Sequence, residues 1–136
     1  MTRTVLIIES DADVAKLLAR QFHSQGWVVL HAQHGESAVR INCDAIVTSW
    51  SANGERAVEI ARDQKIPVVV YSGSAEAYEW CCANDVSFAM KPESPILIEQ
   101  LLSDALKDKR ANEESKREYI EAYAGYDPDE VEDRNG

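Results

Sequence analysis

The sequence has few cationic side chains for its length. Its 136 residues include 14 lysines and arginines against 24 aspartates and glutamates, which gives a formal net charge of -10 at pH 7. Nucleic-acid-binding proteins normally draw their affinity from clustered lysines and arginines that neutralise phosphates. We therefore expect no nucleic-acid partner for this chain.

Long apolar runs are also absent. No run approaches the roughly 18 to 20 apolar residues that a membrane-spanning helix requires, and the N-terminus lacks the charged and then apolar pattern of a secretory signal. We therefore expect no membrane segment and a cytoplasmic protein. The three cysteines, Cys43, Cys81 and Cys82, fit a reducing compartment, because they are odd in number and show no CxxC spacing typical of metal sites.

Sequence motifs of catalysis are missing as well. The chain contains no Walker loop, GxSxG elbow, GxGxxG turn or Cys/His catalytic pattern. His31 and His34 have an HxxH spacing, but no third ligand accompanies them, so we expect no metal site there. The sequence therefore predicts a protein that is not an enzyme.

What the sequence does contain is a regular alternation of apolar runs with amphipathic segments. Runs rich in valine and isoleucine recur at 4–8, 27–31, 45–48 and 67–71, and a weaker one lies at 86–90. Such alternation is typical of consecutive βαβ units with a parallel sheet that is buried on both faces. Because crossovers are right-handed, we predict an α/β fold: a doubly wound, five-stranded, flavodoxin-like sheet of order 2-1-3-4-5.

The segments between these runs predict helices. The first helix is capped by Ser10 or Asp11, has Val14, Leu17, Leu18 and Phe22 on one face as its predicted stripe, and stops before Gly26. Further helices are predicted at 35–41, 54–64 and 75–83, and the second of these has Ala57, Val58, Ile60 and Ala61 as its predicted inner face. The last helix opens at Pro95 with Ser94 as its cap. Its predicted inner stripe consists of Leu97, Ile98, Leu101, Leu102 and Ala105.

The C-terminal part differs in composition from the rest. Residues 111–136 hold nine acidic against three basic side chains, and the apolar stripe of the last helix stops at about residue 107. We predict one domain over 1–109, followed over 110–136 by a charged helical extension and an acidic tail that we expect to be disordered.

Polar side chains follow the predicted strands at their carboxyl ends. These residues are Glu9, Ser10 and Asp11 after the first strand, Ser49 after the third, Ser72 at the fourth and Lys91 after the fifth. In an open parallel sheet, ligands collect outside the carboxyl ends of the strands. The sequence therefore predicts one shallow polar site built from these six residues.

The chain resembles the receiver domain of bacterial response regulators in four segments, 5–11, 44–49, 67–73 and 88–92. The resemblance covers roughly residues 4–107. In that family two adjacent acids end the first strand, a phosphate-accepting aspartate ends the third, a serine or threonine ends the fourth, and a Lys-Pro pair ends the fifth. The chain matches the last two features at Ser72 and at Lys91-Pro92. Of the first pair of acids only Glu9 is kept, since Ser10 is neutral, and the aspartate is replaced by Ser49.

For the family, the resemblance implies a phosphorylation switch in which carboxylates hold Mg²⁺, and it implies a cis bond at Lys91-Pro92. Here Ser10 and Ser49 remove most of the attraction for the metal, so we expect no cofactor, with Glu9 and Asp11 as weak remaining metal ligands. A serine hydroxyl is a poor nucleophile without a positioned base, so we expect no self-catalysed phosphorylation at Ser49. We predict instead that Lys91 pairs with Glu9 in a degenerate phosphorylation pocket. The loop after Ser49 is also shorter than is usual in the family.

Aromatic side chains mark a predicted interaction surface on the helix at 75–83, the strand at 86–90 and the last helix. Tyr78, Trp80 and Phe88 are of the residue types enriched at interface centres. We expect a signalling protein to bind there, namely a histidine kinase, a phosphotransferase or an output protein, or a second copy of the chain.

The leading hypothesis is an atypical receiver domain that acts in two-component signalling through protein binding, without conventional aspartate phosphorylation. A second hypothesis is a working phosphoacceptor that uses Glu9 or Asp11. A third is a flavodoxin-like module that binds a small ligand. The sequence leaves all three open.

Overall fold

The computed structural model describes the backbone of residues 2–122 and the side chains of residues 2–109. The acidic tail predicted from the sequence lies, beyond residue 122, outside the described residues. The chain divides into two compact units, of which the first ends at Asp104 and the second begins at Ala105. The sheet and the candidate site belong to the first unit.

Five parallel strands form one sheet in the order β2-β1-β3-β4-β5. The strands are β1 (Thr4–Ile8), β2 (Val28–Ala32), β3 (Ala45–Thr48), β4 (Val68–Ser72) and β5 (Ser87–Met90). The predicted flavodoxin-like order is therefore confirmed. β3 is buried along its whole length, and β1 and β4 are buried except at their first residues, which is why these strands appear in the sequence as unbroken apolar runs.

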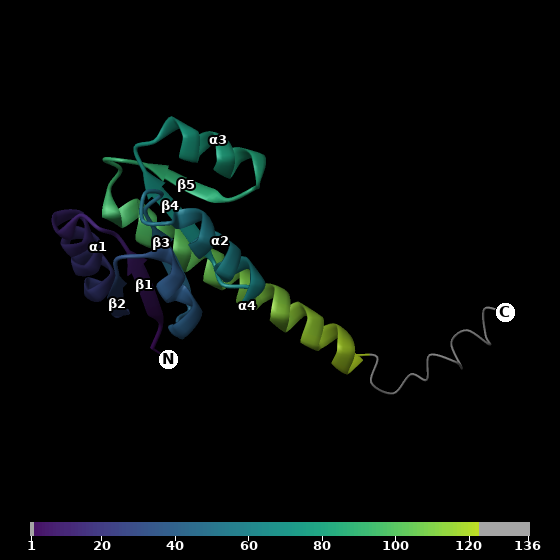
Figure 1. The fold of residues 1–136 in the computed structure, drawn as a ribbon. Helices are drawn as coiled ribbons and strands as arrows, with labels where there is room; N and C mark the ends of the chain where they lie inside the picture. The colour runs from purple at the N-terminus through teal and green to yellow at the C-terminus, as the bar shows by residue number, and fades with distance from the viewer. Residues whose placement is uncertain (1, 123–136) are drawn as a thin grey trace. The chain divides into compact units, whose positions relative to one another are not determined.

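Helices connect the strands (Figure 1). They are α1 (Ala12–Ser24), the 3₁₀-helix η1 (Gly35–Arg40), α2 (Gly54–Asp63), α3 (Ala75–Ala83) and α4 (Pro95–Ala122). α1 begins where the Asp11 side chain accepts hydrogen bonds from the Asp13 and Val14 amides, and Ser74 caps α3 in the same way. The segment predicted as a helix at 35–41 is a single short 3₁₀-helix, because Ile41 is already extended as the chain turns towards β3.

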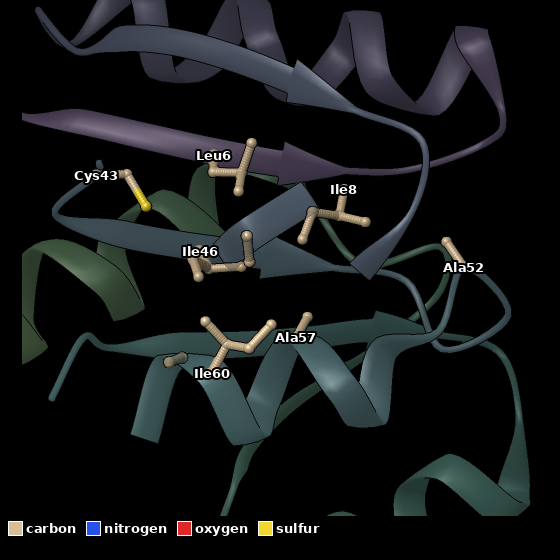
Figure 2. Packing of buried hydrophobic residues seen from close by; sticks show 9 residues of the cluster. Leu6, Ile8, Cys43, Ile46, Ala52, Ala57 and Ile60 are labelled. Atoms are coloured by element: carbon tan, nitrogen blue, oxygen red, sulfur yellow. The ribbon is translucent and has the colours of Figure 1, made fainter. Parts of the chain in front are cut away.

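One face of the sheet packs against η1 and α2. Leu6 and Ile8 of β1 and Ile46 of β3 lie against Ala57 and Ile60 of α2, all of them at most 5% exposed (Figure 2). A second cluster joins α2, β4 and α3 through Val58, Val70, Ala77 and Cys81. The predicted inner face of α2 is therefore confirmed, since every apolar residue assigned to it is buried.

α1 and the first turns of α4 bury fewer of the predicted stripe residues. Leu18 and Phe22 of α1 are buried, as are Ile98 and Leu102 of α4. The sequence wrongly placed three further leucines in the core. Leu17, Leu97 and Leu101 are 55%, 40% and 36% exposed. The periodicity of a sequence shows which side of a helix is apolar, but it does not show how wide a part of that side will be buried. In these two helices only the residues along the middle of the apolar stripe are buried.

A buried polar network holds the start of α4 at the amino ends of β1 and β2. The indole Nε1 of Trp27 donates to Oε1 of Glu99 at 2.9 Å, and the Ser103 hydroxyl donates to the same oxygen at 2.9 Å. The Arg3 guanidinium lies 4.3 Å from the centre of the Trp27 ring. Because Trp27 and Glu99 are both buried, these bonds fix the first turns of α4 within the first unit.

None of the helices in the described part of the chain combines the length and the apolar character needed to cross a membrane.

Candidate functional site

The sheet brings four of the predicted polar residues to one edge. The Ser49 amide donates to the carbonyl of Ile8 at 2.9 Å, which sets Ser49 beside Glu9, the residue after β1. The Lys91 amide donates to the carbonyl of Ser72 at 3.0 Å. The carboxyl ends of β1, β3, β4 and β5 thus meet at one edge of the sheet, because neighbouring parallel strands end on the same side. We refer to the cluster of Glu9, Ser49, Ser72 and Lys91 at this edge as the pocket.

Glu9 and Lys91 form an ion pair in this pocket. Nζ of Lys91 lies 2.5 Å from Oε1 of Glu9, and Oε2 of Glu9 accepts from the Ser10 amide at 3.1 Å. The Glu9 side chain is only 4% exposed, whereas that of Lys91 is 30% exposed. A carboxylate buried to this extent needs a charged partner, and both of its oxygens are engaged here. Lys91 is therefore held by a carboxylate, and the Lys91-Pro92 peptide bond is cis.

Ser49 occupies the end of β3 and is 3% exposed. Its hydroxyl is the one buried side-chain polar atom that finds no hydrogen-bond partner among the described residues. Its carbonyl accepts from the Thr48 hydroxyl at 2.9 Å. A buried hydroxyl without a partner carries a desolvation cost, and none of the described residues is hydrogen-bonded to it as a base that would activate it as a nucleophile.

Ser10 and Asp11, the other predicted members of the site, are exposed, and Ser10 contacts the ion pair through its backbone amide. Oδ1 of Asp11 accepts from the amides of Asp13 and Val14 at 2.9 and 3.3 Å, so this carboxylate serves as the cap of α1. The cap engages Oδ1 of Asp11, and a metal ion that bound this oxygen would compete with the cap.

Ser72 is buried and also engaged in a local bond. Its hydroxyl accepts from the Ser74 amide at 3.1 Å and so fixes the turn that leads into α3. The neighbouring Tyr71 donates from its hydroxyl to the carbonyl of Glu93 at 2.7 Å. Burial raises the pKa of Tyr71, and the charges of Glu93 and Glu9 raise it further.

The loop between β3 and α2 covers the Ser49 side of the pocket through very close backbone contacts. A Cβ atom on Gly54 would lie 2.3 Å from the carbonyl oxygen of Ser49, and one on Gly35 would lie 2.0 Å from the carbonyl oxygen of Asn53. The Gly35 amide donates to the carbonyl of Ala52 at 2.6 Å. Sequence reasoning did not identify either glycine as part of the site. Only the Asn53-Gly54 pair, a common turn signal, pointed to this loop.

The residues present do not fit the Mg²⁺ ion that the receiver family uses. In residues 2–109, no three histidine, cysteine or acidic side chains come together in a way that could hold a metal. Glu9 is bound by Lys91, and Asp11 caps α1. His31 and His34 are engaged separately, His31 at 2.8 Å from the carbonyl of Glu9 and His34 as acceptor from the Glu36 amide.

A hollow of about 200 Å³ adjoins the pocket between α1 and the start of α4, and its lining includes Leu17, Tyr71, Lys91 and Pro95. Small-molecule sites usually enclose roughly 300 to 1,000 Å³. This hollow is therefore smaller than a nucleotide or flavin requires, which counts against the predicted alternative of a ligand-binding module at this edge.

The predicted interaction residues form two aromatic pairs. Tyr78 meets Phe88 edge-on with ring centres 5.5 Å apart, and Trp80 packs on Trp50 at 5.2 Å. Only Tyr78 is exposed, at 49%, while Trp80 and Phe88 are half-buried against the α2–β4–α3 core cluster. A hydrogen bond with Cys82 raises the pKa of Tyr78.

The exposed apolar side chains on α3, β5 and the first turns of α4 are therefore only partly those that the sequence suggested. They are Tyr78, Met90, Ile96, Leu97 and Leu101. The sequence analysis did not single out Met90, and it placed Leu97 and Leu101 on the inner stripe of the last helix.

Comparison with known proteins identifies the fold. No protein-family model matches the chain, and no curated protein matches it either. Among solved structures it is similar to a CheY-like response regulator receiver domain from Methanospirillum hungatei, with a TM-score of 0.71, 12% identity, and coverage of 82% of this chain and 99% of that one. It is also similar to the receiver domain of the Francisella response regulator 1452, with a TM-score of 0.62, 24% identity, and coverage of 76% and 98%.

A third similar structure is the receiver domain of a sensor histidine kinase from Pseudomonas aeruginosa, with a TM-score of 0.65, 17% identity, and coverage of 76% of this chain and 97% of that one. That structure holds a magnesium ion in its active site cleft. At identities below 25%, these likenesses establish that the chain has the receiver fold.

Proposed function

We propose that this chain is an atypical receiver domain that acts in two-component signalling by binding a protein partner, without phosphorylation of an aspartate at the end of β3. One observation carries the proposal. The position after β3 holds Ser49, a buried serine whose hydroxyl has no partner among the described residues, and the nearby Lys91 is already paired with Glu9.

Phosphoryl transfer depends on positioning and on neutralisation of the transferred charge. Here the side chain at the attacking position is an alcohol, and the nearest carboxylate, that of Glu9, is bound to Lys91 and to the Ser10 amide. A serine without a base is a weak nucleophile at neutral pH. The domain accordingly works without catalysis of its own and without a resident metal ion.

The partner surface that we propose is made of α3, β5 and the first turns of α4. Tyr78, Met90, Leu97 and Leu101 are all more than a third exposed there, which is unusual for apolar side chains that serve only the core. The partner is a histidine kinase, a phosphotransferase or an output protein of the pathway, or a second copy of the chain.

We place this interaction in the cytoplasm. The three cysteines are all free thiols, which fits a reducing compartment. Burial raises the pKa of Cys43 to about 11 and also raises the pKa of Cys81, so both remain protonated and unreactive at neutral pH.

Incubation of the full chain with acetyl phosphate and Mg²⁺, followed by intact mass measurement, tests the phosphorylation part of the proposal. The expected result is an unchanged mass. A receiver domain that carries the aspartate, treated in parallel, shows that the donor is active. A labile gain of one phosphoryl group on this chain would overturn the proposal, and loss of that gain in Glu9→Gln or Asp11→Asn would establish the alternative acceptor.

A pair of leucine variants tests the partner surface. Leu97→Ser with Leu101→Ser should abolish capture of the pathway protein from a lysate of the source cell, while Leu17→Ser, which changes an exposed leucine on α1, should leave capture unchanged. Equal capture by both variants would remove this surface from the proposal.

A further inference from the structure

A groove runs between α1 and the edge strand β2, on a part of the molecule that the proposed function does not use. Two adjoining hollows of about 350 and 220 Å³ make up the groove, and they share Ala19 of α1 and Val29 of β2. The floor is therefore made of small apolar side chains. The groove lies outside the pocket of Ser49 and outside the surface of α3, β5 and α4.

The charge of this groove is opposite to that of the whole chain. Lys16, Arg20, His23 and His31 line it, and none of its described lining residues is acidic. The first three lie at i, i+4 and i+7 on α1 and thus share one face of the helix. The chain as a whole has a formal net charge of -10, so this cationic stripe beside an apolar floor differs from the rest of the molecule. Its charge favours an acidic ligand.

β2 also presents free backbone groups along this groove. It lies at the end of the strand order and pairs only with β1. The Val28 amide donates to the carbonyl of Arg3 at 2.8 Å, and the Ala32 carbonyl accepts from the Glu9 amide at 3.1 Å. Because backbone groups alternate along a strand, those of Val29 and His31 point away from β1, to the open edge.

The other face of β2 is apolar and exposed. Val28 and Leu30 are 44% and 37% exposed, since only the short 3₁₀-helix η1 stands between β2 and β3. A strand added beside β2 would place alternate side chains on these two faces. One set would face Lys16 and Arg20, and the other would face Val28 and Leu30.

From these observations we infer that β2 binds an extended acidic segment of a partner protein as an added strand. The segment alternates acidic with apolar residues. Its acidic side chains pair with Lys16 and Arg20 over the groove, its apolar side chains cover Val28 and Leu30, and its backbone bonds to Val29 and His31. This binding is independent of the state of the Ser49 pocket.

The first test uses the full chain and a fluorescent peptide of about ten residues in which glutamate alternates with valine, the pattern that strand addition requires. We expect saturable binding in fluorescence anisotropy, weaker at high salt, and no binding of the peptide with lysine in place of glutamate. Hydrogen exchange at the Val29 and His31 amides should slow when the acidic peptide is bound. Absence of binding, or binding that leaves these two amides unprotected, would overturn the inference.

Matched variants then separate the groove from general charge attraction. Lys16→Gln with Arg20→Gln should weaken binding about fivefold or more, because rim charges at an interface contribute modestly but additively. Arg40→Gln with Lys107→Gln makes the same change in net charge at exposed positions outside the groove and should shift affinity less than about twofold. Equal weakening by the two double variants would show non-specific attraction and refute the proposed site.

Discussion

The two halves of the pocket at the carboxyl end of the sheet are held together by different forces. On the side of β1, β4 and β5, polar groups satisfy one another: Lys91 pairs with Glu9, and Ser72 accepts from the Ser74 amide. On the side of β3, the contacts are between backbone atoms at close approach, and the Ser49 hydroxyl has no partner among the described residues.

The difference follows the polar residues. The half that contains Glu9, Ser72 and Lys91 is closed by hydrogen bonds and an ion pair of these residues. The half that contains Ser49 has Gly35 and Gly54 pressed against backbone carbonyls. The polar side chains of such a pocket bind to one another and not to a ligand, since neither half leaves a charge free for a phosphoryl group.

A methyl group at Gly54 should disrupt the backbone packing of the β3 half of the pocket. Gly54→Ala places a Cβ atom 2.3 Å from the Ser49 carbonyl oxygen, so the loop must move, and we expect a loss of about 3 kcal/mol in the free energy of unfolding. Urea denaturation followed by tryptophan fluorescence measures it. The control is Gly73→Ala in the other half, where the nearest atom, Cβ of Lys91, is 3.9 Å away, and which should change stability by less than about 1 kcal/mol. Equal effects of the two variants would contradict the comparison.

Removal of the Lys91 side chain should disrupt the ion pair in the other half of the pocket. Lys91→Met leaves the buried Glu9 carboxylate unpaired, and we expect a loss of about 2 kcal/mol, below the usual value for a buried pair because Lys91 is 30% exposed. The double variant Glu9→Gln with Lys91→Met removes both charges and should recover part of that loss. If the double variant is less stable than Lys91→Met alone, the ion pair is not what holds this half.

These two halves also differ in how far the sequence predicts them. The apolar runs predicted the strands to within one residue and the sheet order correctly. The signal was clearest for β1, β3 and β4, because a strand buried on both faces consists almost entirely of apolar residues. The Glu9–Lys91 pair was also predicted, since both residues end strands and a buried acid needs a partner. Local chemistry is sufficient for such features.

The β3 half could not be predicted in the same way. The close approach of Gly35 to Asn53 joins segments that are distant in the sequence, and nothing in the residues around Gly35 indicates it. The burial of Trp80 on Trp50 likewise depends on where the loop lies. Helix periodicity placed Leu97 and Leu101 in the core because it cannot show how wide a face the sheet will cover.

Two buried serines, one in each half, allow a finer test. Ser72→Ala removes the acceptor for the Ser74 amide at the start of α3 and should cost about 1 kcal/mol, the usual net value of such a hydrogen bond. Thermal unfolding by circular dichroism is sensitive enough to measure it. A neutral result would mean that the Ser74 amide finds another acceptor and that this half is less dependent on its polar bonds than we infer.

Ser49→Ala makes the same chemical change in the β3 half and should have the smallest effect, of opposite sign. Its hydroxyl is buried without a partner among the described residues, so its removal relieves a desolvation cost, and we expect a gain of up to about 1 kcal/mol. The same unfolding measurements on both variants decide the matter. A loss of stability as large as that of Ser72→Ala would show that the Ser49 hydroxyl has a bound partner in solution, and the closed pocket that we infer would then have to contain a ligand or a water molecule.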